Sequence, residues 1–340
     1  MVLEELCNLN AVSGDEETVR NFILDKIRPY ADEIKIDIMG NLIAYVKGKS
    51  SAKKIMIAAH MDEVGLIVSK ITDDGYLKFK TVGGIDERIL PTKRVEVGNN
   101  RTLGVIGLKA IHLQNKSERE SVTKVSDLVI DIGAVDYAEA AKKVSVGNYV
   151  SFKSDFSSIA EGRCFKGKAL DDRCGCAALT ELIKKRYCYD VYFSFTVQEE
   201  VGTRGAVIAA NYIKPDAALV LEATTCSDVS GVKDYLEVTN LSGGAALSIK
   251  DNGSYSDVDF TKALYNMAKK KNISVQYKRT TSGGNDARAV QLANGGVCTA
   301  ALSVPCRYLH SPVGIISKSD FEAVCMLSEE FLKSADKILG

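Results

Sequence analysis

The 340-residue sequence lacks tryptophan, and it contains only five prolines and three histidines. So few prolines argue against long disordered linkers. Lys+Arg and Asp+Glu are equal at 44 each, so the chain has no net charge at neutral pH. A neutral chain has no bulk field to attract nucleic acid or an anionic membrane surface. No apolar run approaches the ~20 residues that a membrane-spanning helix needs. We therefore expect neither nucleic acid nor a membrane as a partner.

Nine cysteines are present, which is an odd number, and none has the spacing of a zinc finger. Cys174 and Cys176 are separated by one residue, whereas a zinc knuckle or a redox pair separates its thiols by two. We interpret the cysteines as reduced, mostly buried small side chains. The acidic N-terminus does not have the layout of a secretory signal. These features predict a cytoplasmic protein.

The pattern of apolar residues divides the chain into three stretches. A helix is predicted to start at Ser13, with Ser13 and Glu16 as a capping box. Residues 55–59 form a continuous apolar run, typical of a buried parallel strand, which ends at His60. Between residues 64 and 151 the pattern changes to short alternating strands separated by Gly-rich turns, which is typical of a small β-barrel or sandwich.

Alternation of helices and strands returns after Asp171. Strands are predicted at 191–197, 217–221, 273–277 and 297–304, and helices at 173–186, 204–212, 257–271, 286–293 and 320–339. The fold class is therefore α/β, with a mainly parallel sheet interrupted by a β-rich insertion.

Polar side chains occupy one kind of position in this pattern. The residues at or just past the ends of predicted strands are His60, Glu200 and Glu222, and His310 follows another strand by a short loop. Asp171 and Asp172 precede a predicted helix. In open α/β sheets, ligands bind beyond the carboxyl ends of the strands. We therefore expect these side chains to converge.

Each of these residues taken alone also has a simpler interpretation. His60-x-Asp62 could be a histidine at a strand end that hydrogen-bonds to an aspartate in the following turn. The Asp171–Asp172 pair could cap the N-terminus of a helix, and Glu222 could be an acid hydrogen-bonded within a turn. His112 and the cysteines near these segments, Cys174, Cys226 and Cys306, are interpreted as structural.

Taken together, two histidines and three carboxylates form a mixed nitrogen and oxygen ligand set, which suits zinc, cobalt or manganese. Five ligands exceed the three that one catalytic zinc normally takes from a protein, and they fit two ions that share a carboxylate. Three such carboxylates with one further glutamate would also balance the charge of two divalent ions.

Five segments resemble, in this order along the chain, the co-catalytic metallo-aminopeptidases of the glutamyl aminopeptidase and tetrahedral (TET) aminopeptidase type, in peptidase clan MH. They are HMDEVG at 60–65, LDDR at 170–173, VQEEVG at 197–202, GGNDA at 283–287 and RYLHSP at 307–312. The resemblance extends over nearly the whole chain. It implies a zinc-peptidase catalytic domain formed by residues 1–65 and 165–340, with a small PDZ-like β-barrel dimerisation domain inserted at 66–164.

The same resemblance assigns roles by position. It implies that Asp171 bridges the two metal ions and that the bond between Asp171 and Asp172 is cis. The remaining ligands it implies are His60 and Glu222 for one ion, and Glu200 and His310 for the other. Glu199 would be the general base, and Asp62 would orient His60. Three positions depart from many relatives, which carry Asp at Glu222, Thr at Asn285 and a small residue at Arg288.

The expected activity is removal of the N-terminal residue from short peptides by water activated by two divalent ions, with Zn²⁺ expected and Co²⁺ or Mn²⁺ as alternatives. The expected partners are a peptide substrate and further copies of the chain, as dimers that build a tetrahedral dodecamer.

Two other functions stay open at this point. Two carboxylates also serve a glycoside hydrolase, and some relatives are labelled endoglucanases, although the lack of tryptophan removes the usual aromatic sugar platform. The other alternative is a metal-stabilised assembly protein without enzymatic activity. The Glu199–Glu200 pair argues against it, because a structural metal site does not need a second acid that could act as a base.

Overall fold

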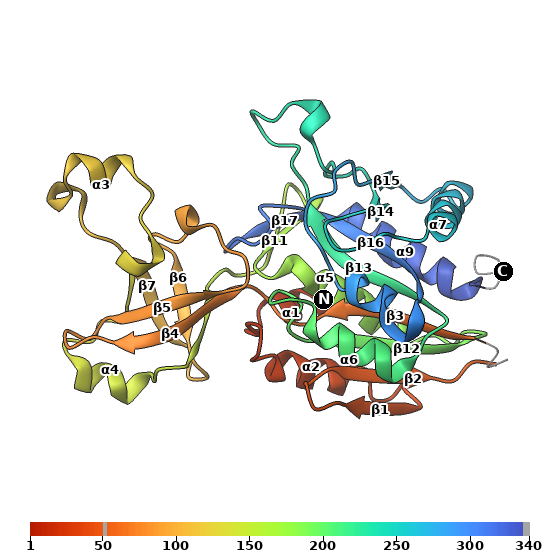
Figure 1. The fold of residues 1–340 in the computed structure, drawn as a ribbon, viewed down its shortest axis with the longest axis horizontal. Coiled ribbons are helices and arrows are strands. Elements are labelled where there is room, and N and C mark those ends of the chain that lie inside the picture. Colours follow the sequence, from red (N-terminus) through yellow and green to blue (C-terminus); the bar gives the residue numbers. More distant parts are fainter. Residues whose placement is uncertain (50–52, 336–340) are drawn as a thin grey trace.

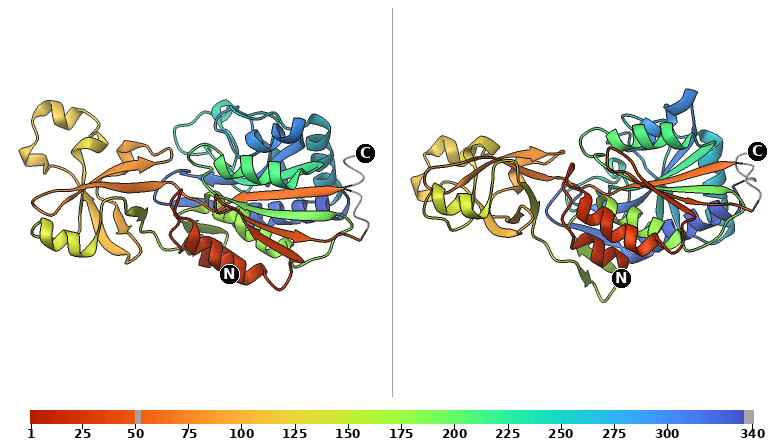
Figure 2. Two further views of the ribbon diagram at one scale, coloured as in Figure 1. Left: turned by 60° about the horizontal axis from the view of Figure 1, so that its bottom comes forward. Right: turned by 90° about the horizontal axis from the view of Figure 1, so that it is seen from below.

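The computed structural model describes residues 1–49 and 53–335. Figure 1 shows two parts, a larger one built around an eleven-stranded sheet and a smaller closed β-barrel. The two views in Figure 2 show the barrel projecting from one end of the larger part. The predicted α/β fold class with a small inserted barrel is confirmed. Among the described residues, no helix combines the length and apolar character needed to cross a bilayer.

The large sheet is mixed, with a parallel centre. Its strands run in the order β1-β2-β12-β3-β13-β16-β17-β11-β10, and β14 joins β15 to β16. The central pairs β12–β3, β3–β13 and β13–β16 are parallel, as the continuous apolar runs predict. The bounds are β1 Glu33–Ile36, β2 Leu42–Val46, β3 Lys54–His60, β10 Ser157–Ile159, β11 Cys164–Gly167, β12 Asp190–Thr196, β13 Ala217–Thr225, β14 Ala245–Ser248, β15 Val275–Tyr277, β16 Cys298–Arg307 and β17 Gly314–Ser317.

Helices cover both faces of this sheet. Residues 55, 57 and 59 of β3 lie in one apolar cluster and residues 56 and 58 in another, because successive side chains of a strand point to opposite faces. The helices on the first face are α1 Val2–Cys7, α2 Glu17–Ile27, α5 Leu170–Leu182, α7 Val258–Lys270 and α9 Lys318–Lys333. Those on the second face are α6 Arg204–Ile213 and α8 Ala287–Gln291.

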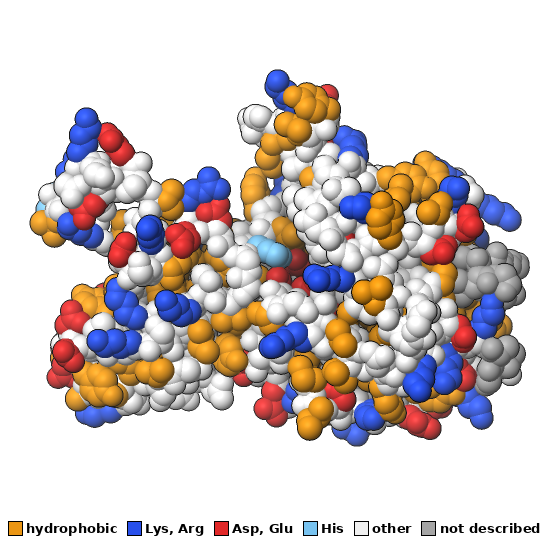
Figure 3. Space-filling view, viewed as in Figure 1, with side chains coloured by type: hydrophobic (Ala, Val, Ile, Leu, Met, Phe, Trp, Pro, Cys, Tyr) orange, Lys and Arg blue, Asp and Glu red, His pale blue; other side chains and the backbone are white. Residues whose placement is uncertain are grey.

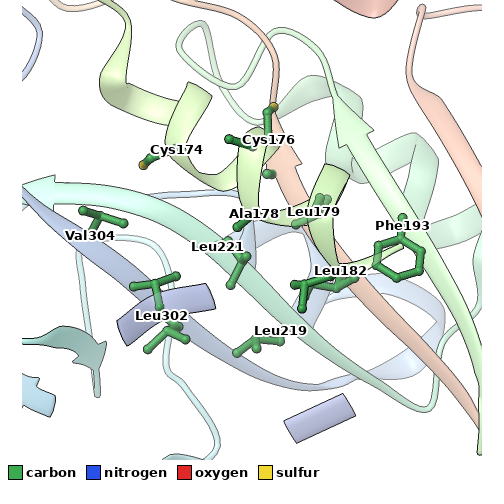
Figure 4. Close-up of a cluster of buried hydrophobic side chains, with 14 of the residues drawn as sticks. Cys174, Cys176, Ala178, Leu179, Leu182, Phe193, Leu219, Leu221, Leu302 and Val304 are labelled. Atoms are coloured by element: carbon green, nitrogen blue, oxygen red, sulfur yellow. The ribbon is translucent and has the colours of Figure 1, made fainter. Parts of the chain in front are cut away.

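Helix α5 lies over the centre of the sheet. Figure 4 shows its side chains Leu179 and Leu182 facing Leu219, Leu221 and Leu302 of β13 and β16. Cys174 and Cys176 belong to the same fully buried cluster, so their interpretation as small core side chains is confirmed. The N-terminal end of α5, where the candidate acids lie, is thus fixed against the strands that carry the other candidates.

The barrel closes in the order β4-β5-β8-β7-β6-β9. Its strands are β4 Gly65–Ile71, β5 Leu77–Val82, β6 Arg94–Val97, β7 Thr102–Gly107, β8 Val129–Asp131 and β9 Tyr149–Phe152, and its helices are α3 Lys116–Glu120 and α4 Tyr137–Lys143. The barrel has its own apolar cluster, which includes Leu66, Phe79, Val95 and Ile130. After β9 the chain returns to the large sheet, where β10 pairs with β11.

Several predicted helix limits differ from the structure, and α5, predicted at 173–186, spans Leu170–Leu182. Helix α2 begins at Glu17, not Ser13, and the predicted capping box is wrong because the N-cap, Glu16, makes no side-chain cap hydrogen bond. The side chains of Ser13 and Glu16 bond elsewhere, as described below. The last helix begins at Lys318, and its predicted end at residue 339 lies outside the described residues.

Candidate metal centre and active site

The candidate ligands come from separate elements that meet at one edge of the sheet. His60 ends β3, Glu200 follows β12, and Glu222 lies in β13. His310 lies in the loop after β16, and Asp171 lies at the start of α5. The structure brings all five together, as the pattern of strand ends predicts.

Asp171 lies between the two histidines. Its Oδ1 is 3.2 Å from Nε2 of His60, and its Oδ2 is 3.4 Å from Nε2 of His310. Each oxygen of one carboxylate therefore faces a different imidazole. A carboxylate presented in this way can bridge two cations.

A further carboxylate stands beside each histidine. Oε2 of Glu222 is 3.5 Å from Nε2 of His60, and Oε2 of Glu200 is 3.2 Å from Nε2 of His310. A cavity of about 20 Å³ opens beside Asp171, Glu200 and His310. A space of this size holds about one water-sized body.

Glu222 reaches this centre from inside a strand. The sequence predicts a strand that ends just before it, but β13 continues to Thr225, so that prediction is wrong. The pairing of β13 with β3 stops at Val220, opposite Ala58, while the pairing with β16 continues. Extending the β3 register by two residues places Glu222 level with His60, which explains why the two side chains meet.

Asp62 is buried and ties three segments together. Its carboxylate accepts hydrogen bonds from the backbone N–H groups of Glu199 and Glu200 at 3.0 and 3.1 Å, and from the Ser13 hydroxyl at 2.6 Å. Nδ1 of His60 lies 3.1 Å from the backbone oxygen of Asp62 and 3.4 Å from its Oδ1. Asp62 thus holds the loop that carries Glu199 and Glu200 close to His60.

The residues of the failed capping box support the same loop. The Ser13 hydroxyl donates to Asp62, and Oε1 of Glu16 accepts the backbone N–H groups of Gly14 and Gln198. Both side chains are therefore used in contacts with residues distant in sequence rather than at the start of α2. A local pattern cannot distinguish these two uses of the same residue types.

The adjacent acids Asp171 and Asp172 have different partners. The peptide bond between them is cis, as the resemblance implies. Asp171 faces the histidines, whereas Oδ1 of Asp172 accepts the backbone N–H of Gly175, three residues on, at 2.9 Å. A Cβ at Gly175 would lie 2.4 Å from Oδ2 of Asp172, so this approach requires glycine. The helix-capping interpretation of the pair therefore holds for Asp172 and not for Asp171.

Negative charge is concentrated at this centre. Burial raises the pKa of Glu199 well above its usual value, and nearby carboxylates, with Glu222 foremost, raise it further. Burial also raises the pKa of Glu200, with Asp171 adding to the effect. Although burial opposes a charged imidazole, contacts with Asp171 and Glu200 raise the pKa of His310 to about 9. A cation bound here would relieve this repulsion.

One acid of the cluster was not singled out from the sequence. Asp286 is fully buried, and its Oδ2 accepts the Thr196 hydroxyl at 2.6 Å, while its Oδ1 has no hydrogen-bond partner among the described residues. Its backbone N–H donates to Glu222 at 3.4 Å, and burial raises the pKa of Asp286, with Glu222 adding to the rise. The GGNDA segment was the available signal, but nothing local indicated that its acid would be buried.

Beneath the centre lies a buried ion-pair network. Nζ of Lys168 donates to both carboxylate oxygens of Glu63, at 2.7 and 2.9 Å, and to the backbone oxygen of Leu9. Arg173 is also buried, 3.6 Å from Glu63, and its Nε donates to the backbone oxygen of Met61. These contacts join the segment that follows His60 to the segment that precedes Asp171.

The remaining sequence candidates lie outside the centre. His112 is exposed in the barrel, in a short 3₁₀ turn, Ile111–Leu113. Cys226 and Cys306 are buried and free. Asn285 donates to the buried Asp251 at 3.1 Å, and the aliphatic part of Arg288 packs beside Gly253.

The donor set fits divalent metal ions. Within the described residues, two groups have ligand atoms within 4.8 Å of one another, namely His60 with Asp171 and Glu200, and His60 with Asp172 and Glu222. Neither group contains a thiol. Imidazole nitrogen together with carboxylate oxygen suits zinc, cobalt and manganese.

The chain matches a known family and known structures. Residues 40–327 match the model of the M42 glutamyl aminopeptidases. A protein of Acetivibrio thermocellus, named provisionally as an aminopeptidase, is 40% identical over 96% of this chain and 97% of its own length. The lysyl aminopeptidase of Pyrococcus furiosus is 31% identical over 98% of this chain and 96% of its own length.

Three solved structures have the same fold. A TET aminopeptidase from Thaumarchaeota archaeon SCGC AB-539-E09 superposes with a TM-score of 0.95 at 35% identity, covering 98% of this chain and 95% of its own. The Pyrococcus horikoshii TET1 peptidase is described as assembling into a tetrahedron or a large octahedral shell. It superposes with a TM-score of 0.86 at 35% identity, covering 98% of each chain. A Thermotoga maritima protein named endoglucanase superposes with a TM-score of 0.83 at 37% identity, covering 99% of this chain and 98% of its own.

The family model matches most of the chain, and the relatives match nearly all of it. The fold, the segments that resemble this family and the named relatives agree, and the two other functions considered from the sequence are not favoured. The chain belongs to the M42 glutamyl aminopeptidase family and is a metal-dependent aminopeptidase.

Proposed function

We propose that this chain removes the N-terminal residue from short peptides with the help of two divalent metal ions. The observation that carries the proposal is the position of Asp171, whose two oxygens face His60 and His310 separately. In this proposal His60 and Glu222 complete one ion site, and Glu200 and His310 complete the other. Zn²⁺ is the proposed ion, with Co²⁺ and Mn²⁺ fitting the same ligands.

The bound ions would lower the pKa of a water molecule and polarise the scissile carbonyl. Glu199 is the proposed general base. Its carboxylate makes no hydrogen bond with the described residues, and its backbone N–H is fixed by Asp62. It would take a proton from the attacking water and deliver it to the nitrogen of the leaving peptide. Asp62 would orient His60 and hold the Glu199–Glu200 loop.

Substrate choice tests this function directly. We expect the protein to hydrolyse aminoacyl-p-nitroanilides, to leave β-glucan intact and to lose its activity when a chelator removes divalent ions. Restoring Zn²⁺, Co²⁺ or Mn²⁺ should restore hydrolysis. Release of reducing sugar from β-glucan, or hydrolysis of nitroanilides that persists after complete removal of the metal, would overturn the proposal. Bound metal without any hydrolysis across a full set of aminoacyl groups would instead favour a non-enzymatic assembly protein.

We further propose that the chain forms dimers through its inserted domain, assigned to residues 66–164, and that the dimers build a dodecamer. The Pyrococcus horikoshii relative is described as assembling into a tetrahedron or a large octahedral shell. The barrel strands occupy residues 65–152, and this part exposes large apolar side chains, including Leu103, Ile111, Leu113 and Val135. Exposed apolar surface of this kind is typical of an interface between protein chains.

Light scattering can test the assembly. We expect a mass of twelve times the 36.8 kDa of one chain, because burial of the exposed barrel residues favours association. Replacing Ile111 and Leu113 together by serine should lower the mass in solution while each chain stays folded, since both side chains are exposed on the single chain. A monomer at all concentrations would contradict the proposal.

A further inference from the structure

A second and larger cavity adjoins the metal centre, between the barrel and the loop after β16. Its volume is about 660 Å³. The barrel contributes Gly84, Asp86, Arg88, Ile89 and Lys93 to its wall, and the other wall is the segment 308–313, which includes His310. Figure 3 shows a hollow between the two parts in which a histidine and acidic side chains are visible.

The barrel segment that lines this cavity touches the metal centre itself. A Cβ at Gly84 would lie 3.5 Å from Nδ1 of His310, and a Cβ at Gly83 would lie 3.4 Å from Cβ of Glu200. No side chain of residues 83 and 84 therefore separates the centre from the cavity. A molecule held at the centre can extend into the cavity.

The sizes of the two cavities indicate what each can hold. The space beside Asp171 has a volume of only about 20 Å³, enough for about one water-sized body. The cavity beside the barrel lies within the range of about 300–1,000 Å³ that is typical of sites for small organic ligands. A peptide of a few residues is a ligand of that class.

One positively charged side chain of the cavity wall has no acidic partner among the residues that the structure describes. Arg88 is paired with Asp86, since Nε of Arg88 lies 2.9 Å from each Asp86 oxygen. Lys93 is half-buried, lines the cavity and forms no ion pair with any described residue. The other titratable groups of the wall are Tyr308 and His310, and His310 belongs to the metal centre. Lys93 is therefore a cation available for an anionic group of a ligand.

We propose that this cavity binds the part of a short peptide that follows the scissile bond, and that Lys93 forms an ion pair with the C-terminal carboxylate of the peptide. The inference rests on the proposed aminopeptidase function, because only that function places a peptide bond at the centre. A free carboxylate is the one anionic group that every short peptide carries at this end. The site would thus select peptides short enough for their C-terminus to reach Lys93.

The experiment compares peptides of two to four residues, with one fixed N-terminal residue and glycine after it, as free acids and as C-terminal amides. For the wild type we expect KM to be lower for the acid by about tenfold at one or more of these lengths, as a charge-assisted hydrogen bond gives. Lys93→Met should abolish the difference between acid and amide, and Lys93→Arg should retain it. Lys142→Met, at an exposed position on α4, serves as the matched control.

The ratio of KM values for acid and amide is measured within each variant, so a general loss of folded protein does not alter it. Equal KM values for acid and amide at every length in the wild type would overturn the inference, and so would an unchanged ratio in Lys93→Met. In either case hydrolysis of aminoacyl-p-nitroanilides by the wild type would show that the proposed function itself stands. Absence of that hydrolysis would overturn the function and the inference together.

Discussion

Glu199→Gln should lose most of its turnover while it keeps its metal ions. We expect kcat on aminoacyl-p-nitroanilides to fall by about 10²–10⁴-fold, which is the usual contribution of a general base. Glutamine has nearly the same shape as glutamate but cannot take up the proton. The backbone N–H of residue 199, which Asp62 accepts, is unaffected by the substitution. Elemental analysis of the dialysed protein should find the wild-type metal content.

The adjacent residue provides the matched control. Glu200→Gln changes a carboxylate whose Oε2 is 3.2 Å from Nε2 of His310, so we expect that variant to lose metal as well as turnover. The two assignments would be exchanged if Glu199→Gln lost metal and Glu200→Gln did not. A Glu199→Gln variant with most of its turnover intact would refute the assignment of the base.

Asp171→Asn should lower the metal content of the protein, unlike Glu199→Gln, which should leave it unchanged. The amide has one acceptor oxygen and no charge, so it cannot offer an anionic oxygen both to the side of His60 and to the side of His310. We expect at most one tightly bound ion per chain and a fall in turnover of more than about 10³-fold, because removal of even one electrostatic group from a catalytic site costs about 10²–10³. Metal titration followed by dialysis and elemental analysis gives the stoichiometry.

Asp73→Asn, in an exposed turn of the barrel, controls for the loss of one negative charge. That variant should keep two ions and wild-type turnover. If Asp171→Asn also kept two ions per chain, the bridging assignment would be wrong, whereas a single ion in the wild type would refute the dinuclear centre.

Much of the fold follows from local sequence pattern. The apolar run at 55–59 forms the central parallel strand β3, and the alternating pattern after residue 64 forms the barrel. These predictions succeed because the period of apolar side chains and the turn residues act over short distances. The capping box at Ser13 fails for the complementary reason, since Ser13 donates to Asp62, 49 residues away.

Part of the candidate site could also be predicted from local sequence pattern. Strand ends predicted the convergence of His60, Glu200 and His310, and the structure brings them together. Asp286 was not singled out, because its burial depends on the packing of its segment beside Thr196 and Glu222. The different partners of Asp171 and Asp172 also depend on where α5 begins.

The amino-acid sequence by itself determined the alternation of helices and strands, the inserted barrel and the order of the chemical groups along the chain. Only the tertiary structure determined which oxygen faces which histidine, which acid caps a helix and how the barrel borders the metal centre. The physical reason is the distance along the chain over which each effect acts. Backbone preference and apolar periodicity are properties of neighbouring residues. A polar contact at a buried site is set by the register of strands that lie far apart in sequence, as Glu222 and His60 illustrate.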